Sequence, residues 1–370
     1  MRSEGVSPHT NAIRTAIAEI LGMENVMIRR ICAKILAAAV VLFVSASPVM
    51  AVVEFNDGGV WDIDYDNNDE VWVDHQSPGM GTTINMLDGG SITPGLRSFE
   101  DSIINILGGL IRDYLYTYQS SEVTVSGGSM NRLHASSQVV VSGGTIKYDL
   151  NAYPGSQVTI SGGSVEGKLN ANLNSQVAVS GGSIKTGVFA FDNSQVAISG
   201  GVMGVLYTFD DSQVAVSGGS MGSLATEGSS QITVSGGSMD YLAVNINSRV
   251  IVSGGKVGDL GVHHSSQVIV SGGLLEGDMY LSTNGVLTID GSDFAIDGTP
   301  VGYIELTSIL GLGYDDEPYR RLTGTLLNGD PLDNDFRIGN SAKIILVPEP
   351  ATLLLLGLGG LILRRKRRTV

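Results

Sequence analysis

QVAVSGGSMGSL (Gln213–Leu224) recurs 18 residues later as QITVSGGSMDYL (Gln231–Leu242), and the two units share the Ser-Gly-Gly triplet and the apolar positions of Val214, Val216, Met221 and Leu224. The Ser-Gly-Gly triplet at the centre of this unit occurs nine times, at intervals of 16, 19, 19, 19, 18, 18, 18 and 18 residues; the triplets begin at Ser126, Ser142, Ser161, Ser180, Ser199, Ser217, Ser235, Ser253 and Ser271. A repeat of this length is typical of solenoids, in which each repeat forms one coil.

The apolar residues keep a fixed spacing around each triplet. Val214 and Val216 alternate with polar neighbours before the two glycines, as in a half-buried strand, and Met221 and Leu224 follow them. In the 19-residue repeats the counterpart of Leu224 comes one residue later, so the extra residue always falls in the same corner. This regularity indicates that every repeat adopts the same backbone path.

The pattern predicts an all-β fold, a single-stranded parallel β-helix or solenoid of 18–19 residues per coil. Stacking lets each coil hydrogen-bond to its neighbours about 4.8 Å away, and the Gly-Gly pair allows a sharp corner. We expect about eleven coils, roughly 50 Å in length at that rise. Glutamines should form a ladder along the stack, namely Gln138, Gln157, Gln176, Gln195, Gln213, Gln231 and Gln267.

The segments outside the repeats suggest five regions. We expect a leader at 1–51, an N-terminal cap at 52–83, the repeats at 84–297, a C-terminal cap at 298–346 and a sorting tail at 347–370. Caps are expected because open solenoid ends would pair with other chains.

The leader has the features of a secretory signal peptide. A basic stretch beginning at Met27, the expected true start, precedes an apolar run from Ile35 to Val44, and small residues lead to a cleavage site after Ala51. The only cysteine, Cys32, lies in this leader, so the exported body would contain no disulfide and no thiol nucleophile.

The tail has three parts in order. Pro348, Glu349 and Pro350 precede an apolar stretch from Thr352 to Leu363, and a basic cluster follows: Arg364, Arg365, Lys366, Arg367 and Arg368. The cluster would stay on the cytoplasmic side and stop export. This arrangement resembles the PEP-CTERM sorting domain, and the segment Leu322–Ile338 is similar to a closing segment of other PEP-CTERM repeat proteins.

The resemblance implies processing by an exosortase, a membrane-embedded transpeptidase. It would recognise Pro348, Glu349 and Pro350, remove the tail and pass the body to the cell surface. The protein would reach the membrane through the export translocon, be held there by its C-terminal helix until processing, and then lie at the surface or in the extracellular matrix. The family's hosts usually produce exopolysaccharide, which suggests a biofilm setting.

The charge of the expected body limits its partners. It contains 12 basic and 33 acidic residues, a net charge of −21. Such a surface repels nucleic acid, because that binding depends on Lys and Arg neutralising phosphates. Asp62, Asp64 and Asp66 alternate like the start of a calcium loop, but Asn67 and Val73 replace the glycine and glutamate of the EF-hand pattern. Calcium is therefore a weak candidate, a solvated acidic face is the favoured interpretation, and we expect no other cofactor.

These observations favour a structural or adhesive cell-surface protein. A carbohydrate-binding surface module is the alternative, and a polysaccharide-degrading β-helix enzyme is a further one. We expect no enzyme, because coils of nearly constant length leave no insertion that could wall a substrate cleft.

Overall fold

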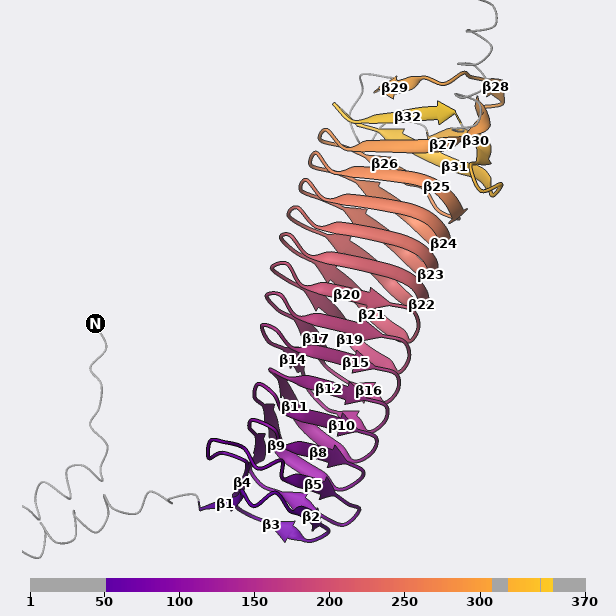
Figure 1. Cartoon of the computed structure of the whole chain (residues 1–370). Coiled ribbons are helices and arrows are strands. Elements are labelled where there is room, and N and C mark those ends of the chain that lie inside the picture. Colours follow the sequence, from indigo (N-terminus) through magenta and orange to yellow (C-terminus); the bar gives the residue numbers. More distant parts are fainter. Residues whose placement is uncertain (1–50, 308–318, 340, 349–370) are drawn as a thin grey trace, which may run out of the picture. The chain divides into compact units, whose positions relative to one another are not determined.

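The computed structural model describes residues 51–307, 319–339 and 341–348; the predicted signal peptide, the apolar tail and the basic cluster lie outside these ranges. The described residues are all-β and contain no helix. Their strands stack in parallel as a solenoid of about 13 turns, which confirms the predicted fold class (Figure 1). The count exceeds the expected eleven coils because segments expected as caps also join the stack, with strands Val52–Phe55 and Val60–Ile63 at one end and Pro331–Ile338 and Lys343–Pro348 at the other.

Each coil runs along three faces of the solenoid. The first face is built from β2 (Val60–Ile63), β5 (Thr83–Met86), β8 (Ile103–Ile106), β10 (Glu122–Val125), β12 (Gln138–Val141), β15 (Gln157–Ile160), β18 (Gln176–Val179), β20 (Gln195–Ile198) and β32 (Lys343–Pro348). The short second face contains β3 (Asp66–Asn67), β6 (Ser91–Ile92), β13 (Thr145–Ile146) and β16 (Ser164–Val165).

The third face completes the coil. It contains β1 (Val52–Phe55), β4 (Glu70–Val73), β7 (Gly95–Ser98), β14 (Leu150–Ala152), β17 (Lys168–Ala171), β26 (Met279–Leu281) and β31 (Pro331–Ile338). Longer strands cover more than one face: β9 (Leu110–Thr117), β11 (Ser129–Ala135), β19 (Ser183–Ala190), β21 (Val202–Thr208), β22 (Gln213–Thr226), β23 (Gln231–Val244), β24 (Arg249–Val262), β25 (Gln267–Leu275) and β27 (Val286–Ile296).

The strand register follows the repeat in the sequence. Gln157 lies opposite Gln176, and Gln176 lies opposite Gln195. Between β19 and β21 the register shifts after Ile184, where the 19-residue coil has its extra residue. The extra residue is therefore accommodated as a bulge in one corner, as the spacing predicts.

The core is a single column of apolar side chains inside the stack. In β22, Val214, Val216, Met221 and Leu224 are all 5% exposed or less. Equivalent positions are buried in the other coils and join one continuous hydrophobic cluster. Because each coil shields the apolar layer of its neighbours, the stack can bury residues that one coil alone would leave exposed.

Close contact between coils explains the Gly-Gly corner. Gly219 has a positive φ of 84°, a conformation that L-residues with a Cβ rarely adopt. Gly218 lies so near the coil below that a Cβ there would be 2.3 Å from the carbonyl oxygen of Ser199. Only glycine fits either position without moving the backbone.

The segment expected as an N-terminal cap contributes strands to the same stack. β1 pairs with β4 and β2 pairs with β5, in both cases in parallel. Within the described ranges, no strand pairs with the outer edges of β1 and β2. The solenoid therefore begins immediately after Ala51, the expected cleavage site.

At the other end the chain leaves the stack after β27 and then returns to it. It forms β28 (Thr299–Pro300), β29 (Glu305–Thr307) and β30 (Arg320–Leu326), and β30 pairs antiparallel with both β27 and β31. β31 then stacks in parallel on β26, and β32 stacks in parallel on β27. β29 covers part of the outer edge of β32 by antiparallel pairing.

Candidate functional site

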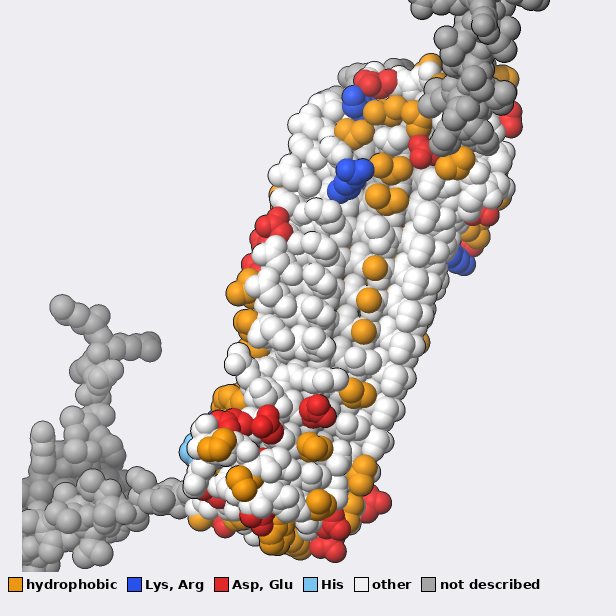
Figure 2. Space-filling model, in the orientation of Figure 1, with side chains coloured by type: hydrophobic (Ala, Val, Ile, Leu, Met, Phe, Trp, Pro, Cys, Tyr) orange, Lys and Arg blue, Asp and Glu red, His pale blue; other side chains and the backbone are white. Residues whose placement is uncertain are grey.

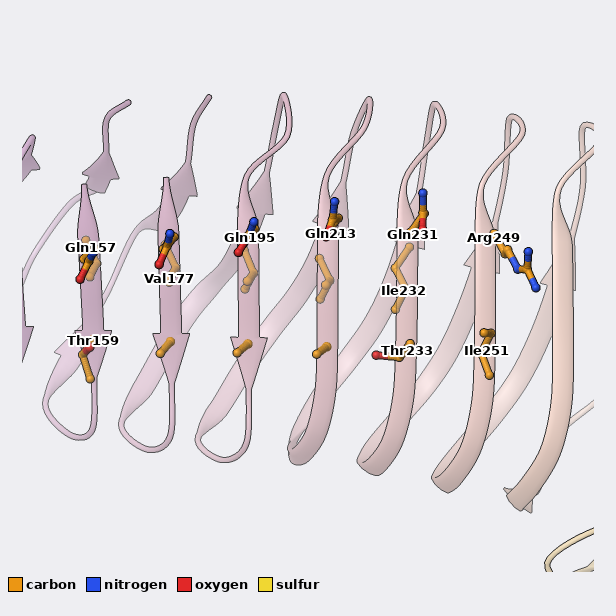
Figure 3. A pocket seen from close by; sticks show the side chains of 17 residues that line it. Gln157, Thr159, Val177, Gln195, Gln213, Gln231, Ile232, Thr233, Arg249 and Ile251 are labelled. Carbon is orange, nitrogen blue, oxygen red and sulfur yellow. The ribbon is translucent and has the colours of Figure 1, made fainter. Parts of the chain in front are cut away.

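The first face of the solenoid carries a shallow groove of about 600 Å³. Glutamine side chains from successive coils lie in one row along it (Figure 3). Small outward residues, such as Ala178, Ala197 and Ala215, line the groove beside that row, and Thr159 and Thr233 lie at the equivalent positions nearer its ends. Coils about 4.8 Å apart thus repeat one amide and one small side chain along the groove.

The groove is uncharged apart from one residue. Arg249 stands where the other coils have glutamine, and the lining residues include no Asp or Glu. The visible surface likewise shows few charged side chains along the middle of the stack (Figure 2). An extended neutral chain with hydroxyl or amide groups matches this surface, because each glutamine amide can both donate and accept hydrogen bonds.

Sequence reasoning identified the glutamine ladder but not the groove beside it. The alternation Gln195-Val-Ala-Ile contains the signal, because a large polar residue and a small residue share the outward side of the strand. Repeated over several coils, this alternation produces a row of amides next to a strip with little side-chain volume.

The acidic residues considered for calcium lie at the N-terminal end of the stack. Asp62 accepts a hydrogen bond from Asn85 at 2.8 Å, and Asp66 accepts one from the Ser91 hydroxyl at 2.5 Å. In the part of the chain that the structure covers, no group of three or more His, Cys, Asp or Glu side chains is placed to hold a metal ion. The structure does not gather Asp62, Asp64 and Asp66 into such a group, and calcium binding stays a prediction for isothermal titration.

A partly buried ion pair lies between the first coils. Arg97 Nε contacts Glu70 at 2.5 Å, and the Tyr114 hydroxyl donates to Glu70 at 2.7 Å. Burial alone would raise the pKa of Glu70, but the two hydrogen bonds and the charge of Arg97 together hold this pKa below its usual value. The pair joins β4 and β7, so its evident effect is to hold neighbouring coils together.

The sorting end is continuous with the fold. Leu346 in β32 is buried and lies opposite Ile289, and Pro348, the last described residue of the strand, lies opposite Gly291. Glu349, Pro350 and the basic residues from Arg364 to Arg368 fall outside the described ranges. The last turn of the solenoid therefore leads into the predicted recognition motif with no spacer between them.

A family model for the PEP-CTERM protein-sorting motif matches residues 346–368. The chain carries a PEP-CTERM sorting motif. This motif implies an exported protein that an exosortase processes and sorts to the cell surface. Its first three residues belong to β32, so the PEP-CTERM motif and the solenoid share part of one strand.

The other comparisons give no relatives. No curated protein and no solved structure shows significant similarity to the chain. Among the described residues there is also no helix that is long and apolar enough to span a membrane. The comparison that bears on function is therefore the match to the PEP-CTERM sorting motif.

Proposed function

We propose that the protein is a structural or adhesive element of the cell surface that an exosortase releases from its tail into a polysaccharide-containing matrix. The continuity between β32 and the PEP-CTERM motif is the observation that carries this proposal. A stack of self-supporting coils needs no further domain to hold its terminal strand in place. Processing at the motif would leave that strand paired with β27.

Export and processing are tested by determining the N-terminus and the C-terminus of the mature protein. We expect the mature N-terminus at Val52, after cleavage at Ala51, because β1 begins at Val52. We expect the C-terminus near Pro348, with the apolar and basic segments removed. Intact-mass measurement on protein recovered from the cell surface checks both ends. Recovery of the unprocessed chain, with leader and tail still attached, from the cytosol would overturn the proposal.

Carbohydrate binding is the second candidate function, and the glutamine groove is the observation that favours it. Two coils rise by about 9.6 Å, a spacing similar to the disaccharide repeat of an extended glycan. Successive sugar residues could then meet equivalent amides along the groove. Co-sedimentation with the host's exopolysaccharide separates the candidates, because a purely structural solenoid would show no binding above background.

We propose no catalytic activity for the groove. A glycoside hydrolase or lyase generally uses paired carboxylates or a cluster of charged groups at the bond that breaks. The groove lining contains a single charged side chain, Arg249. Incubation of the protein with a panel of polysaccharides should release no reducing sugar, and measurable release would favour the enzyme alternative.

A further inference from the structure

A second ladder follows the corner that links the third face to the first face of the next coil. The corner usually has four residues, and the first of them faces outward. Aromatic residues at this position stack between neighbouring coils. Phe99 and Tyr118 lie 4.5 Å apart with ring planes 6° from parallel, and Phe191 and Phe209 lie 4.9 Å apart at 7°. The ladder therefore places flat rings at about the rise of one coil.

Several coils have no ring at this position, where Asn172, Glu227, Asn245 or Ser282 stands instead, and in one further coil the corner itself is shorter. The coil that begins at Glu122 is the 16-residue repeat, and its corner between β11 and β12 contains only Ser136 and Ser137. Ser137 is buried and donates to Thr117 Oγ1 at 2.6 Å, so Ser136 occupies the outward position. Tyr118 stands one coil before Ser136, and Tyr153 stands one coil after it.

The shortened corner leaves a slot of about 460 Å³. Tyr118 and Tyr153 come from the coils on either side of Ser136, and the remaining lining residues are His75, Phe99, Glu100, Gln119 and Pro154. The two tyrosines are separated by two rises, about 9.6 Å. A flat ring placed beside Ser136 would lie about 4.8 Å from Tyr118 and would meet the part of Tyr153 that lines the slot, because His134 already stacks on the Tyr153 ring.

Neighbouring side chains hold both tyrosines in position. Arg97 Nη1 donates to the Tyr118 hydroxyl at 3.0 Å. The Tyr153 hydroxyl lies 3.1 Å from His134 Nδ1, and these two rings are stacked 5.9 Å apart at 12°. A slot whose walls are fixed before a ligand arrives loses little conformational entropy on binding.

We propose that this slot binds one uncharged pyranose unit of an extracellular polysaccharide. The apolar face of a sugar ring stacks on aromatic side chains, and Glu100, Gln119 and Ser136 offer polar groups to its hydroxyls. Glu100 and the net charge of −21 on the body would repel a uronic acid. The slot therefore selects neutral sugars over acidic ones.

This inference deepens the carbohydrate-binding candidate, and it concerns a surface separate from the glutamine groove. The slot uses corners of the early coils, whereas the groove lies on the first face between Gln157 and Ile251. Loss of slot binding and loss of groove binding can therefore be observed independently.

The test restores the missing ring. The substitution Ser136→Tyr should fill the slot while adding one more stacked ring to the ladder, so that the fold is kept. The matched control is Asn172→Tyr, which adds a ring at the equivalent corner position next to Tyr153 but outside the slot. A third variant, Tyr153→Ala, removes one wall without filling the space.

Binding is measured by isothermal titration of the exported protein with cellohexaose, chitohexaose and an oligogalacturonide of equal length. We expect heat from at least one neutral hexasaccharide and none from the oligogalacturonide. Ser136→Tyr and Tyr153→Ala should each weaken binding by about tenfold or more, while Asn172→Tyr keeps it. Melting temperatures confirm that each variant is folded.

Two results would overturn the slot proposal. One is equal affinity in the wild type and in folded Ser136→Tyr and Tyr153→Ala, which would place saccharide binding elsewhere, as in the glutamine groove. The other is an absence of heat with every neutral hexasaccharide. Neither result affects the proposal that the protein is exported and processed, because that depends on the mature termini.

Discussion

Substitution of Gly218 by alanine should widen the spacing between two neighbouring coils at the Gly-Gly corner. The added Cβ would stand 2.3 Å from the Ser199 carbonyl oxygen and 2.9 Å from its carbon. Real Cβ contacts essentially never fall below 3.0 Å, so the corner must open by about 0.7 Å. The nearby hydrogen bond from Ser220 N to the Gly201 carbonyl oxygen, now 3.0 Å, would then stretch beyond hydrogen-bonding range.

The size of the effect follows from the hydrogen bonds that are lost. An unsatisfied buried backbone group costs about 1–3 kcal/mol, and the opening affects at least one donor and one acceptor. We therefore expect Gly218→Ala to destabilise the local coil pair by about 3 kcal/mol. The loss should stay local, because each coil contacts only its neighbours.

Gly155→Ala is the matched control for this prediction. Gly155 also lies in a corner and has a φ of 79°, but an added Cβ there meets nothing within 4 Å. Only the left-handed conformation is then penalised, at about 1 kcal/mol. Hydrogen exchange measured by mass spectrometry should show faster exchange in β20 and β22 for Gly218→Ala than for Gly155→Ala. Equal exchange in the two variants would refute the steric argument for the Gly-Gly corner.

Three further predictions test other parts of the molecule. Removing Arg97 (R97A) should leave the largely buried Glu70 without its charged partner and cost about 2 kcal/mol at pH 7 in urea unfolding. Because the pKa of Glu70 is held low, the stability from this pair is present at neutral pH and is lost as the pH falls through that lowered pKa, so the difference from wild type should shrink in acid. Ala197→Glu should place a charge in the glutamine groove and reduce co-sedimentation with a polysaccharide, with no change in melting temperature, since Ala197 is exposed; unchanged co-sedimentation would place binding elsewhere. Glu349→Ala should leave the tail attached, seen as a higher intact mass at the membrane, and normal processing would contradict the assigned recognition motif.

The repeat pattern was sufficient to predict the coil, its buried positions and its strand register. The alternation Val214-Ala-Val216 fixes which side of the strand faces inward, and the glycines fix where the chain turns. These are local rules, and each coil applies them again. For this reason the pairing of Leu206 with Leu224 could be expected from the sequence alone.

The irregular coils were harder to predict because their identity depends on neighbours. β1 to β4 lack the Ser-Gly-Gly triplet, and their place in the stack appears only through pairing with β5, β6 and β7. The slot beside Ser136 arises from a shortened corner between two aromatic corners. In the sequence, the shortened corner is visible as the single 16-residue interval between Ser-Gly-Gly triplets. That interval alone does not show which side chains line the slot.

The direction of the hydrogen bonds has a mechanical consequence. They run parallel to the solenoid axis, whereas β32 runs perpendicular to it. A force applied to the chain after Pro348 and directed along the axis would therefore break the hydrogen bonds of β32 one after another instead of all together. β32 would first separate from β29, with which it pairs antiparallel, and the turns of the solenoid would then unfold one at a time. Each turn of 18 residues would release about 60 Å of extended chain, so a pull at this end would lengthen the molecule in steps of one turn.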